Sequence, residues 1–261
     1  MTLTTQSFIH YLSKLLHRYT PASALRAGLF TSQFSMLHRR CIKHILTTLY
    51  LVGLAYPVSA DGWDLQYDRD GIRIYTQTLS ESSFKAFRGE MQLGAPLKKI
   101  LAHHIDMESM TEWLYDCVES KLVQTIDEQT FLVYQRTDAP WPVSDRDYLF
   151  KARFSQDPED FSVRVDFEAA NGMKDNTDEC VRVTQLRGYW KYTPVDPEHT
   201  FVEYETHADP AGQVPAWLAN QFVIDQPLET LRKLRERLQH NDYVPDSRLD
   251  FIKTPEFRRT N

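Results

Sequence analysis

The last third of the chain joins a strand-like segment to a long amphipathic helix through a turn rich in proline and glycine. Residues 201–207 mix β-branched and aromatic side chains with charges, which predicts a strand, and residues 209–215 have turn chemistry. A helix that is apolar on one side must cover another element, here a sheet, and the space between them is either packed solid or open to a ligand. The apolar residues of this helix recur mostly every three or four positions, at Trp217, Leu218, Phe222, Ile224, Leu228, Leu231, Leu234 and Leu238.

Pro227 lies inside this predicted helix. Proline removes a backbone donor and clashes with the preceding turn, so either one helix kinks there or a second helix starts near Pro227. The apolar face continues in phase through Leu228 and Leu231, which favours one kinked helix.

The front of the chain has the composition of an export signal. Residues 1–60 contain no Asp or Glu, and a basic segment at 38–43 is followed by a mainly apolar stretch at 45–58. This stretch is shorter than the ~18 residues that span a bilayer, and Val58-Ser59-Ala60 has the spacing of a cleavage site. The pattern predicts a signal peptide over 36–60 and export, to the periplasm. An uncleaved N-terminal membrane anchor is the alternative.

Met36 directly precedes the signal pattern, so we interpret residues 1–35 as an over-extended N-terminus. The folded domain is predicted over residues 61–240, and residues 241–261 form a polar tail that we expect to pack loosely. The chain holds 30 basic and 36 acidic residues, and removal of the six basic residues in 1–60 leaves a formal charge of −12. Such an acidic domain argues against binding to nucleic acid or electrostatic docking on anionic lipid. We expect a monomer with at most transient membrane contact.

Two cysteines remain after the predicted cleavage, Cys117 and Cys180. An exported protein can join them in a disulfide, but two separate buried thiols are the simpler interpretation.

Period-two alternation dominates residues 61–210, with an Asp-Gly hairpin turn at 68–71. Helices are predicted over 96–104 and 107–115, before the long C-terminal one. This order predicts an α+β fold with the helices on one face of an antiparallel sheet. The predicted strands cover residues 63–67, 72–78, 84–93, 118–126, 131–137, 146–154, 161–167, 181–192 and 200–208.

Motifs for catalysis are absent from the sequence. It has no GxSxG, HExxH, P-loop, GxGxxG or CxxC motif, so we predict no catalytic residue, metal or cofactor. His103 and His104 are adjacent and are interpreted as a helix surface rather than a metal site. His207 shares a strand face with Glu203 and Glu205, which favours a charged solvent face over a general base.

Two segments resemble the START domain, the lipid-transfer fold named after the steroidogenic acute regulatory protein. They are Trp-Pro-Val-Ser-Asp-Arg-Asp-Tyr at 141–148 and the run at 207–220 that begins His-Ala-Asp-Pro-Ala-Gly-Gln-Val-Pro. The resemblance implies a helix-grip fold, in which a curved antiparallel sheet wraps around the C-terminal helix and encloses a hydrophobic tunnel. It also implies binding of a lipid or other apolar molecule without chemical change. The tunnel entrance would lie at 139–145 and 209–215, and we expect gating at 209–215 and at Pro227.

Strand parity adds candidate pocket walls. Tyr148, Phe150, Ala152 and Phe154 share one face, which should point to the helix. In the preceding strand, the resemblance places residues 131, 133 and 135 inside, although Leu132 and Tyr134 form an equally apolar opposite face. The candidate ligand-binding residues are Trp113, Phe131, Val133, Gln135, Trp141, Tyr148, Phe150, Tyr204, Trp217 and Phe222.

Some sterol-binding relatives carry an acidic and a basic residue inside the tunnel. The corresponding positions here hold Gln135 and Ala152, so a sterol held in that way is not expected. Two alternative functions are an enzyme of the cyclase or dehydratase type that uses the same cavity, and a protein-interaction module with a closed cavity.

Overall fold

The computed structural model describes residues 62–139, 143–172, 180–240 and 245–257. The predicted signal peptide, the N-terminal extension and Trp141 lie outside the described residues.

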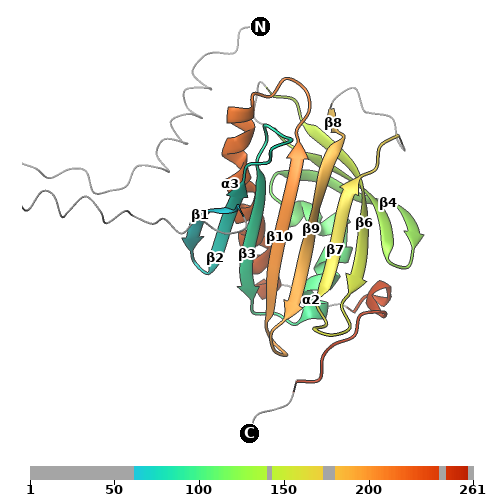
Figure 1. Cartoon of the computed structure of the whole chain (residues 1–261). Coiled ribbons are helices and arrows are strands. Elements are labelled where there is room, and N and C mark those ends of the chain that lie inside the picture. Colours follow the sequence, from blue (N-terminus) through green and yellow to red (C-terminus); the bar gives the residue numbers. More distant parts are fainter. Residues whose placement is uncertain (1–61, 140–142, 173–179, 241–244, 258–261) are drawn as a thin grey trace, which may run out of the picture. The chain divides into compact units, whose positions relative to one another are not determined.

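The described chain forms one ten-stranded sheet in the order β1-β2-β3-β10-β9-β7-β6-β5-β4, and β8 pairs with β6 off this path (Figure 1). The pairs along the path are antiparallel, as predicted. The strands are β1 (Asp64–Arg69), β2 (Ile72–Gln77), β3 (Ala86–Leu93), β4 (Cys117–Asp127), β5 (Thr130–Thr137), β6 (Arg146–Gln156), β7 (Val163–Ala169), β8 (Val181–Val183), β9 (Gln185–Pro194) and β10 (Thr200–Asp209).

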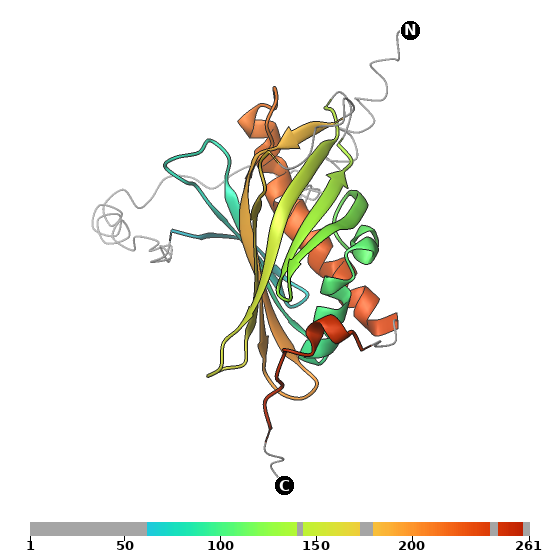
Figure 2. The same cartoon turned by 90° about the vertical axis from the view of Figure 1, so that its right-hand side faces the viewer.

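The helices gather on one face of this sheet (Figure 2). They are α2 (Leu97–Ile105), η1 (Glu108–Glu112), α3 (Ala216–His240) and η2 (Ser247–Leu249). The predicted α+β architecture with a C-terminal helix across the sheet is therefore confirmed. None of the described helices combines the length and hydrophobicity needed to cross a bilayer.

Local differences from the predicted elements have identifiable causes. The segment predicted as one strand over 181–192 divides at Thr184, because β8 pairs in parallel with β6 while β9 pairs with β7 and β10. The helix predicted over 107–115 is the short 3-10 helix η1. The hairpin turn between β1 and β2 is as predicted, since Asp70 and Gly71 both have positive φ, 56° and 71°.

The tail does not pack loosely throughout, which corrects the prediction. Leu249 and Ile252 are 2% and 1% exposed and belong to the main core. The η2 turn is capped by Asp246, whose carboxylate accepts from the backbone N–H of Arg248. Phe251 also packs against this core, and Gln156 on β6 makes two hydrogen bonds with the backbone of Lys253.

α3 is one helix that contains Pro227, so the single-helix prediction is confirmed. After the proline, its apolar residues are fully buried, at Leu228, Leu231, Leu234 and Leu238. Gly89 on β3 permits this close packing, because an added Cβ would lie 2.8 Å from Leu231 Cδ1 and 3.3 Å from Pro227 Cβ. Before the proline, Leu218, Phe222 and Val223 remain partly exposed. The second half of α3 is thus fixed to the sheet, while the first half covers the site described next.

Alternating side chains on β5 point to two different environments. Phe131 and Val133 belong to the main core under the helices, and the Phe131 and Phe154 rings meet edge to face at 5.7 Å. Leu132 and Tyr134 form a small separate cluster with Leu149 and Ala170. The parity implied by the resemblance is therefore the observed one.

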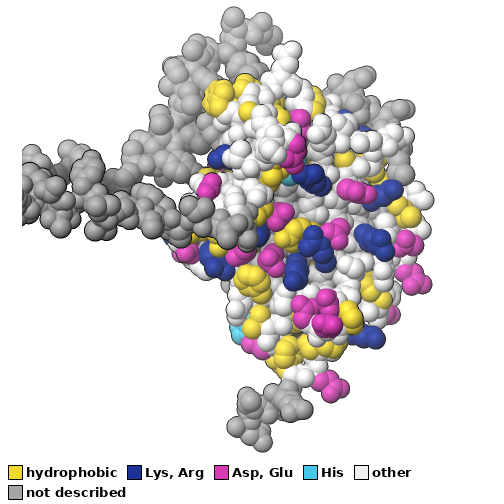
Figure 3. All heavy atoms as spheres, in the orientation of Figure 1, with side chains coloured by type: hydrophobic (Ala, Val, Ile, Leu, Met, Phe, Trp, Pro, Cys, Tyr) yellow, Lys and Arg dark blue, Asp and Glu magenta, His cyan; other side chains and the backbone are white. Residues whose placement is uncertain are grey.

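The sheet face turned away from α3 is polar. Lys, Arg, Asp and Glu side chains are scattered over it (Figure 3). Glu203, Glu205 and His207 are partly exposed on β10, and Glu205 accepts a hydrogen bond from the Tyr189 hydroxyl. His207 does not border the cavity under α3. Its interpretation as part of a charged outer face is confirmed.

Candidate functional site

A cavity of about 250 Å³ lies under the first half of α3. Its walls come from β3, β5, β6, β7, β9 and β10, the segment from α2 to β4, and α3. Most lining side chains are apolar or aromatic. An apolar cavity of ~150 Å³ already holds benzene, so this space is large enough for part of an apolar molecule.

Aromatic rings form one wall of the cavity. Trp190 stacks on Tyr204 with ring centroids 3.8 Å apart and an interplanar angle of 6°. Trp113 meets Trp190 edge to face at 5.8 Å, and His104 does so at 5.5 Å. All four residues line the cavity. Such rings offer a large, rigid apolar surface with few rotatable bonds.

His104 is a buried member of this wall, which corrects its interpretation as helix surface. It is 5% exposed, and its Nδ1 lies 2.8 Å from the hydroxyl of the buried Tyr192. Desolvation lowers the pKa of His104 from 6.5 to about 3, so the imidazole is neutral at pH 7. His103 is also buried, and its Nδ1 accepts from Arg237 Nε. α2 therefore packs both histidines inward, because the helix lies between the sheet and the C-terminal segment.

His104 should make the fold sensitive to acid. Its pKa is near 6.5 in the unfolded chain and about 3 in the folded protein, so below pH 6.5 the unfolded chain binds the proton more readily. The free energy of unfolding should fall as the pH drops from about 6.5 toward 3, by up to about 1.4 kcal/mol per pH unit from this residue. Urea denaturation of the wild type and His104→Gln at several pH values measures this. The two pH profiles should converge toward acid, and parallel profiles would contradict the assignment.

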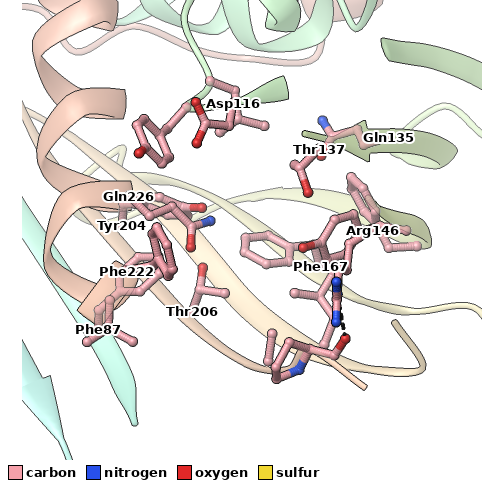
Figure 4. A pocket seen from close by; sticks show the side chains of 18 of the residues that line it. Phe87, Asp116, Gln135, Thr137, Arg146, Phe167, Tyr204, Thr206, Phe222 and Gln226 are labelled. Atoms are coloured by element: carbon pink, nitrogen blue, oxygen red, sulfur yellow. Dashed lines mark hydrogen bonds between the residues drawn. The ribbon is translucent and has the colours of Figure 1, made fainter. Parts of the chain in front are cut away.

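Polar groups interrupt the apolar lining at a few places (Figure 4). Gln135 and Thr137 border the cavity from β5, while Tyr204 and Thr206 border it from β10. The Gln135 amide donates to Met110 Sδ at 3.0 Å and more weakly to Ser120 Oγ at 3.4 Å. Burial raises the pKa of Tyr204 to about 12, so its phenol is a neutral hydroxyl. These groups can orient a ligand by hydrogen bonds without carrying charge.

Arg146 brings a positive charge into the cavity. It is 6% exposed and lies at the start of β6, where the strand meets the turn before α3. Its Nε donates to the Pro210 carbonyl at 3.0 Å and its Nη2 to the Ala211 carbonyl at 3.2 Å. Its Nη1 donates to the Ser144 carbonyl. One guanidinium therefore joins the two segments in which the entrance was predicted.

Asp116 adds a carboxylate on another part of the lining. Its pKa is raised, chiefly by desolvation, and Tyr115 opposes this by hydrogen bonding. The Asp116 carbonyl accepts from the Asp138 backbone N–H at 2.9 Å, which ties the start of β4 to the end of β5. Asp116 therefore also contributes to this wall through its backbone carbonyl.

The structure brings six of the ten predicted site residues to the cavity. Phe131 and Val133 are buried in the core beside it without lining it. Trp141 lies outside the described residues. The lining residues are Trp113, Gln135, Tyr148, Phe150, Tyr204 and Phe222.

Trp217 is not a cavity residue, and that prediction is wrong. It is 66% exposed and does not border the cavity. Leu218 and Phe222, four positions apart, face the cavity from the same helix. Each residue rotates about 100° around a helix axis, so the position before Leu218 turns away.

Most lining residues were not among the ten candidates, and three of those missed are Arg146, Trp190 and His104. Arg146 lies two positions before Tyr148 and therefore shares its strand face, so the parity argument already included it. Trp190 is placed inside in the same way, two positions before the fully buried Tyr192. His104 follows the buried Ile100 by one helical turn. In each case a polar or bulky residue occupies a position at which the spacing of the element places an inward-facing side chain.

Cys117 and Cys180 carry free thiols in the structure. Burial raises the pKa of the Cys117 thiol to about 11, so it is un-ionised and unreactive at pH 7. Among residues 62–139, 143–172, 180–240 and 245–257, no group of three or more His, Cys, Asp or Glu side chains is placed to hold a metal ion.

Comparison with known proteins gives consistent matches. The family model of the START domain matches residues 51–243. An uncharacterized protein of Pseudomonas aeruginosa is 33% identical over 183 residues, which cover 70% of this chain and 90% of that protein. A STAR-related lipid transfer protein from Xanthomonas axonopodis, solved as a fragment, has 33% identity and a TM-score of 0.64, with 69% of this chain and 100% of that chain covered. Human STARD10 has the same fold at 16% identity, with a TM-score of 0.62 over 69% of this chain and 74% of its own.

Proposed function

The chain belongs to the START domain family, and we propose that it is an exported carrier that holds an apolar ligand in the cavity under α3 and releases it unchanged. The observation that carries this proposal is the aromatic-lined cavity of about 250 Å³ between the sheet and the first half of α3. The lipid-transfer description of the Xanthomonas axonopodis protein, 33% identical to this chain, supports it.

Burial of the ligand's apolar surface would drive binding. Each Å² of apolar surface that leaves water contributes about 25 cal/mol, so ~200 Å² gives about 5 kcal/mol before the costs of ordering. The rings of Trp113, Trp190 and Tyr204 are already packed against one another, so little side-chain entropy is lost when a ligand arrives. The apolar wall is thus already formed, and a ligand can bind without rearranging these side chains.

Release requires an opening, and the division of α3 favours one place for it. The half after Pro227 is anchored by four buried leucines, whereas the half before it keeps partly exposed residues over the cavity. Proline lacks the backbone N–H that would join the two halves by a helical hydrogen bond. Movement of residues 216–226 would uncover the cavity while the four buried leucines after Pro227 stay in place.

The chemistry of the lining supports a role without catalysis. Among the described lining residues, the single imidazole is that of His104, which is neutral and engaged with the Tyr192 hydroxyl. A proton-transfer enzyme needs a pKa near its working pH, and the pKa of His104, about 3, is far below it. The neutral state of His104 therefore favours carriage over a cyclase-type reaction in which this imidazole transfers the proton.

Native mass spectrometry of the protein purified from its own host, followed by organic extraction, tests the proposal. We expect one bound apolar molecule, which extraction releases with unchanged mass. We also expect the mass of the polypeptide to correspond to a chain that begins at Asp61. Chemical conversion of an added ligand would support the enzyme alternative. A protein that carries no molecule and takes up none when apolar ligands are added would support the protein-interaction alternative. A polypeptide that retains residues 36–60 would contradict cleavage of the signal peptide.

A further inference from the structure

We propose that Arg146 binds the anionic group of an amphiphilic ligand, a carboxylate or phosphate attached to an apolar chain. The inference rests on the proposed function, because the apolar chain must occupy the cavity under α3. It adds the chemical class of the ligand's polar end and the position of that end.

The guanidinium of Arg146 has N–H donors that its contacts within the protein do not use. A guanidinium has five N–H groups. The contacts to the carbonyls of Pro210, Ala211 and Ser144 use one each on Nε, Nη2 and Nη1. One N–H therefore remains on each terminal nitrogen, and two such donors are what a carboxylate or phosphate accepts.

No described carboxylate neutralises this charge. The acceptors of Arg146 are backbone carbonyls, and within the described ranges no Asp or Glu oxygen lies within 4.0 Å of its guanidinium. Asp145, the preceding residue, pairs with Arg136 at 3.8 Å. Desolvation lowers the pKa of Arg146 and outweighs the opposite effect of the Asp145 charge. A buried charge is costly without an opposite charge, so a cation at this place favours an anion in the cavity.

Neighbouring hydroxyls extend the site. Tyr148 follows Arg146 by two positions on the same face of β6, and both line the cavity. Burial raises the pKa of Tyr148, so its phenol is a neutral hydroxyl. Thr137 is the β5 residue paired with Arg146 in the sheet, and it also lines the cavity. Figure 4 shows Thr137 and Arg146 on one side of the cavity and Tyr204 on the other. A guanidinium next to two hydroxyls is suited to an oxyanion, while the aromatic wall is suited to a chain.

Other charges at the cavity do not alter this assignment. Asp116 lies on another part of the lining, away from Arg146 (Figure 4). Lys85 borders the cavity but is partly exposed to solvent, where water screens its charge. The buried, unneutralised cation is therefore the one that would select the ligand's charge.

Calorimetric titration with decanoate and with decanol at pH 8 tests the proposal, since these probes share a chain and differ in charge. The wild type should bind decanoate at least about 10-fold more tightly, which corresponds to ~1.4 kcal/mol. Arg146→Met should remove this preference, and Arg146→Lys should restore part of it. Arg153→Met removes a cation from the opposite face of the same strand and should retain the full preference. Inorganic phosphate, which lacks a chain, should not bind measurably.

Equal wild-type affinities for the two probes would overturn the Arg146 proposal and leave the carrier function standing. A preference that persists in Arg146→Met would also overturn it. Binding of inorganic phosphate as tight as that of decanoate would identify a free-anion site instead. Failure of both probes to bind would contradict the proposed function itself. If Arg146→Met does not fold, the wild-type ratio and Arg146→Lys still decide the matter.

Discussion

Replacement of Asp147 by alanine is expected to lower the free energy of unfolding by about 3 kcal/mol. Asp147 is completely buried and accepts two hydrogen bonds from Arg182, from Nε at 3.0 Å and from Nη2 at 2.6 Å. This bidentate geometry is the strongest form of carboxylate pairing. Without the carboxylate, the Arg182 guanidinium, whose side chain is 9% exposed, loses its bidentate anionic partner.

Urea denaturation of Asp147→Ala against Asp166→Ala provides the measurement. Asp166 pairs with Arg164 at 2.7 Å on the same sheet, but the two side chains are 51% and 42% exposed. Pairs of that kind contribute about 0–1 kcal/mol, so Asp166→Ala should be almost neutral. Equal losses for the two variants would show that burial does not set the strength of the Asp147 pair.

The same ion pair marks a limit of prediction from sequence. Alternation in residues 146–154 correctly separates Tyr148 and Phe150 from Asp147, and a charged residue on the outer face is normally solvated. Asp147 is buried because β8 pairs in parallel with the start of β6, with Arg182 opposite Asp147. β8 has only three residues and was predicted as part of one longer strand over 181–192. So short a segment gives too weak a local signal to predict this pairing.

Helices and strands whose apolar residues recur at a regular spacing were predictable from the sequence. Buried polar residues that interrupt this spacing were not. The apolar period of residues 217–238 indicated α3, and alternation indicated the sheet and the inner face of β6. Polar residues in phase with an apolar face were not predicted to lie inside. His104 was assigned to a helix surface, and Arg146 was placed only at the start of a strand, yet both are buried. Their burial follows from the cavity and from the segments that cover it, which only the assembled fold brings together.

Substitution of Ala152 by phenylalanine should abolish binding of apolar ligands. Ala152 lies on β6, is 4% exposed and lines the cavity next to Phe150. A ring added at this position would occupy part of a space of only about 250 Å³. We expect the affinity for decanol to fall at least about 100-fold, which corresponds to ~2.7 kcal/mol. Stability should change by less than about 1.5 kcal/mol, because the ring enters an existing cavity rather than a packed core.

Lys151→Phe is the matched control, since its side chain points to the opposite face of the same strand. It should bind decanol like the wild type in the same titration. Retained affinity in Ala152→Phe would place the ligand outside the cavity under α3. The comparison also separates the two levels of the proposal. A blocked cavity must weaken decanoate and decanol together, whereas loss of the Arg146 guanidinium should weaken decanoate alone. An apolar wall that provides affinity and one buried cation that provides selectivity are therefore distinguishable by two substitutions on the same strand.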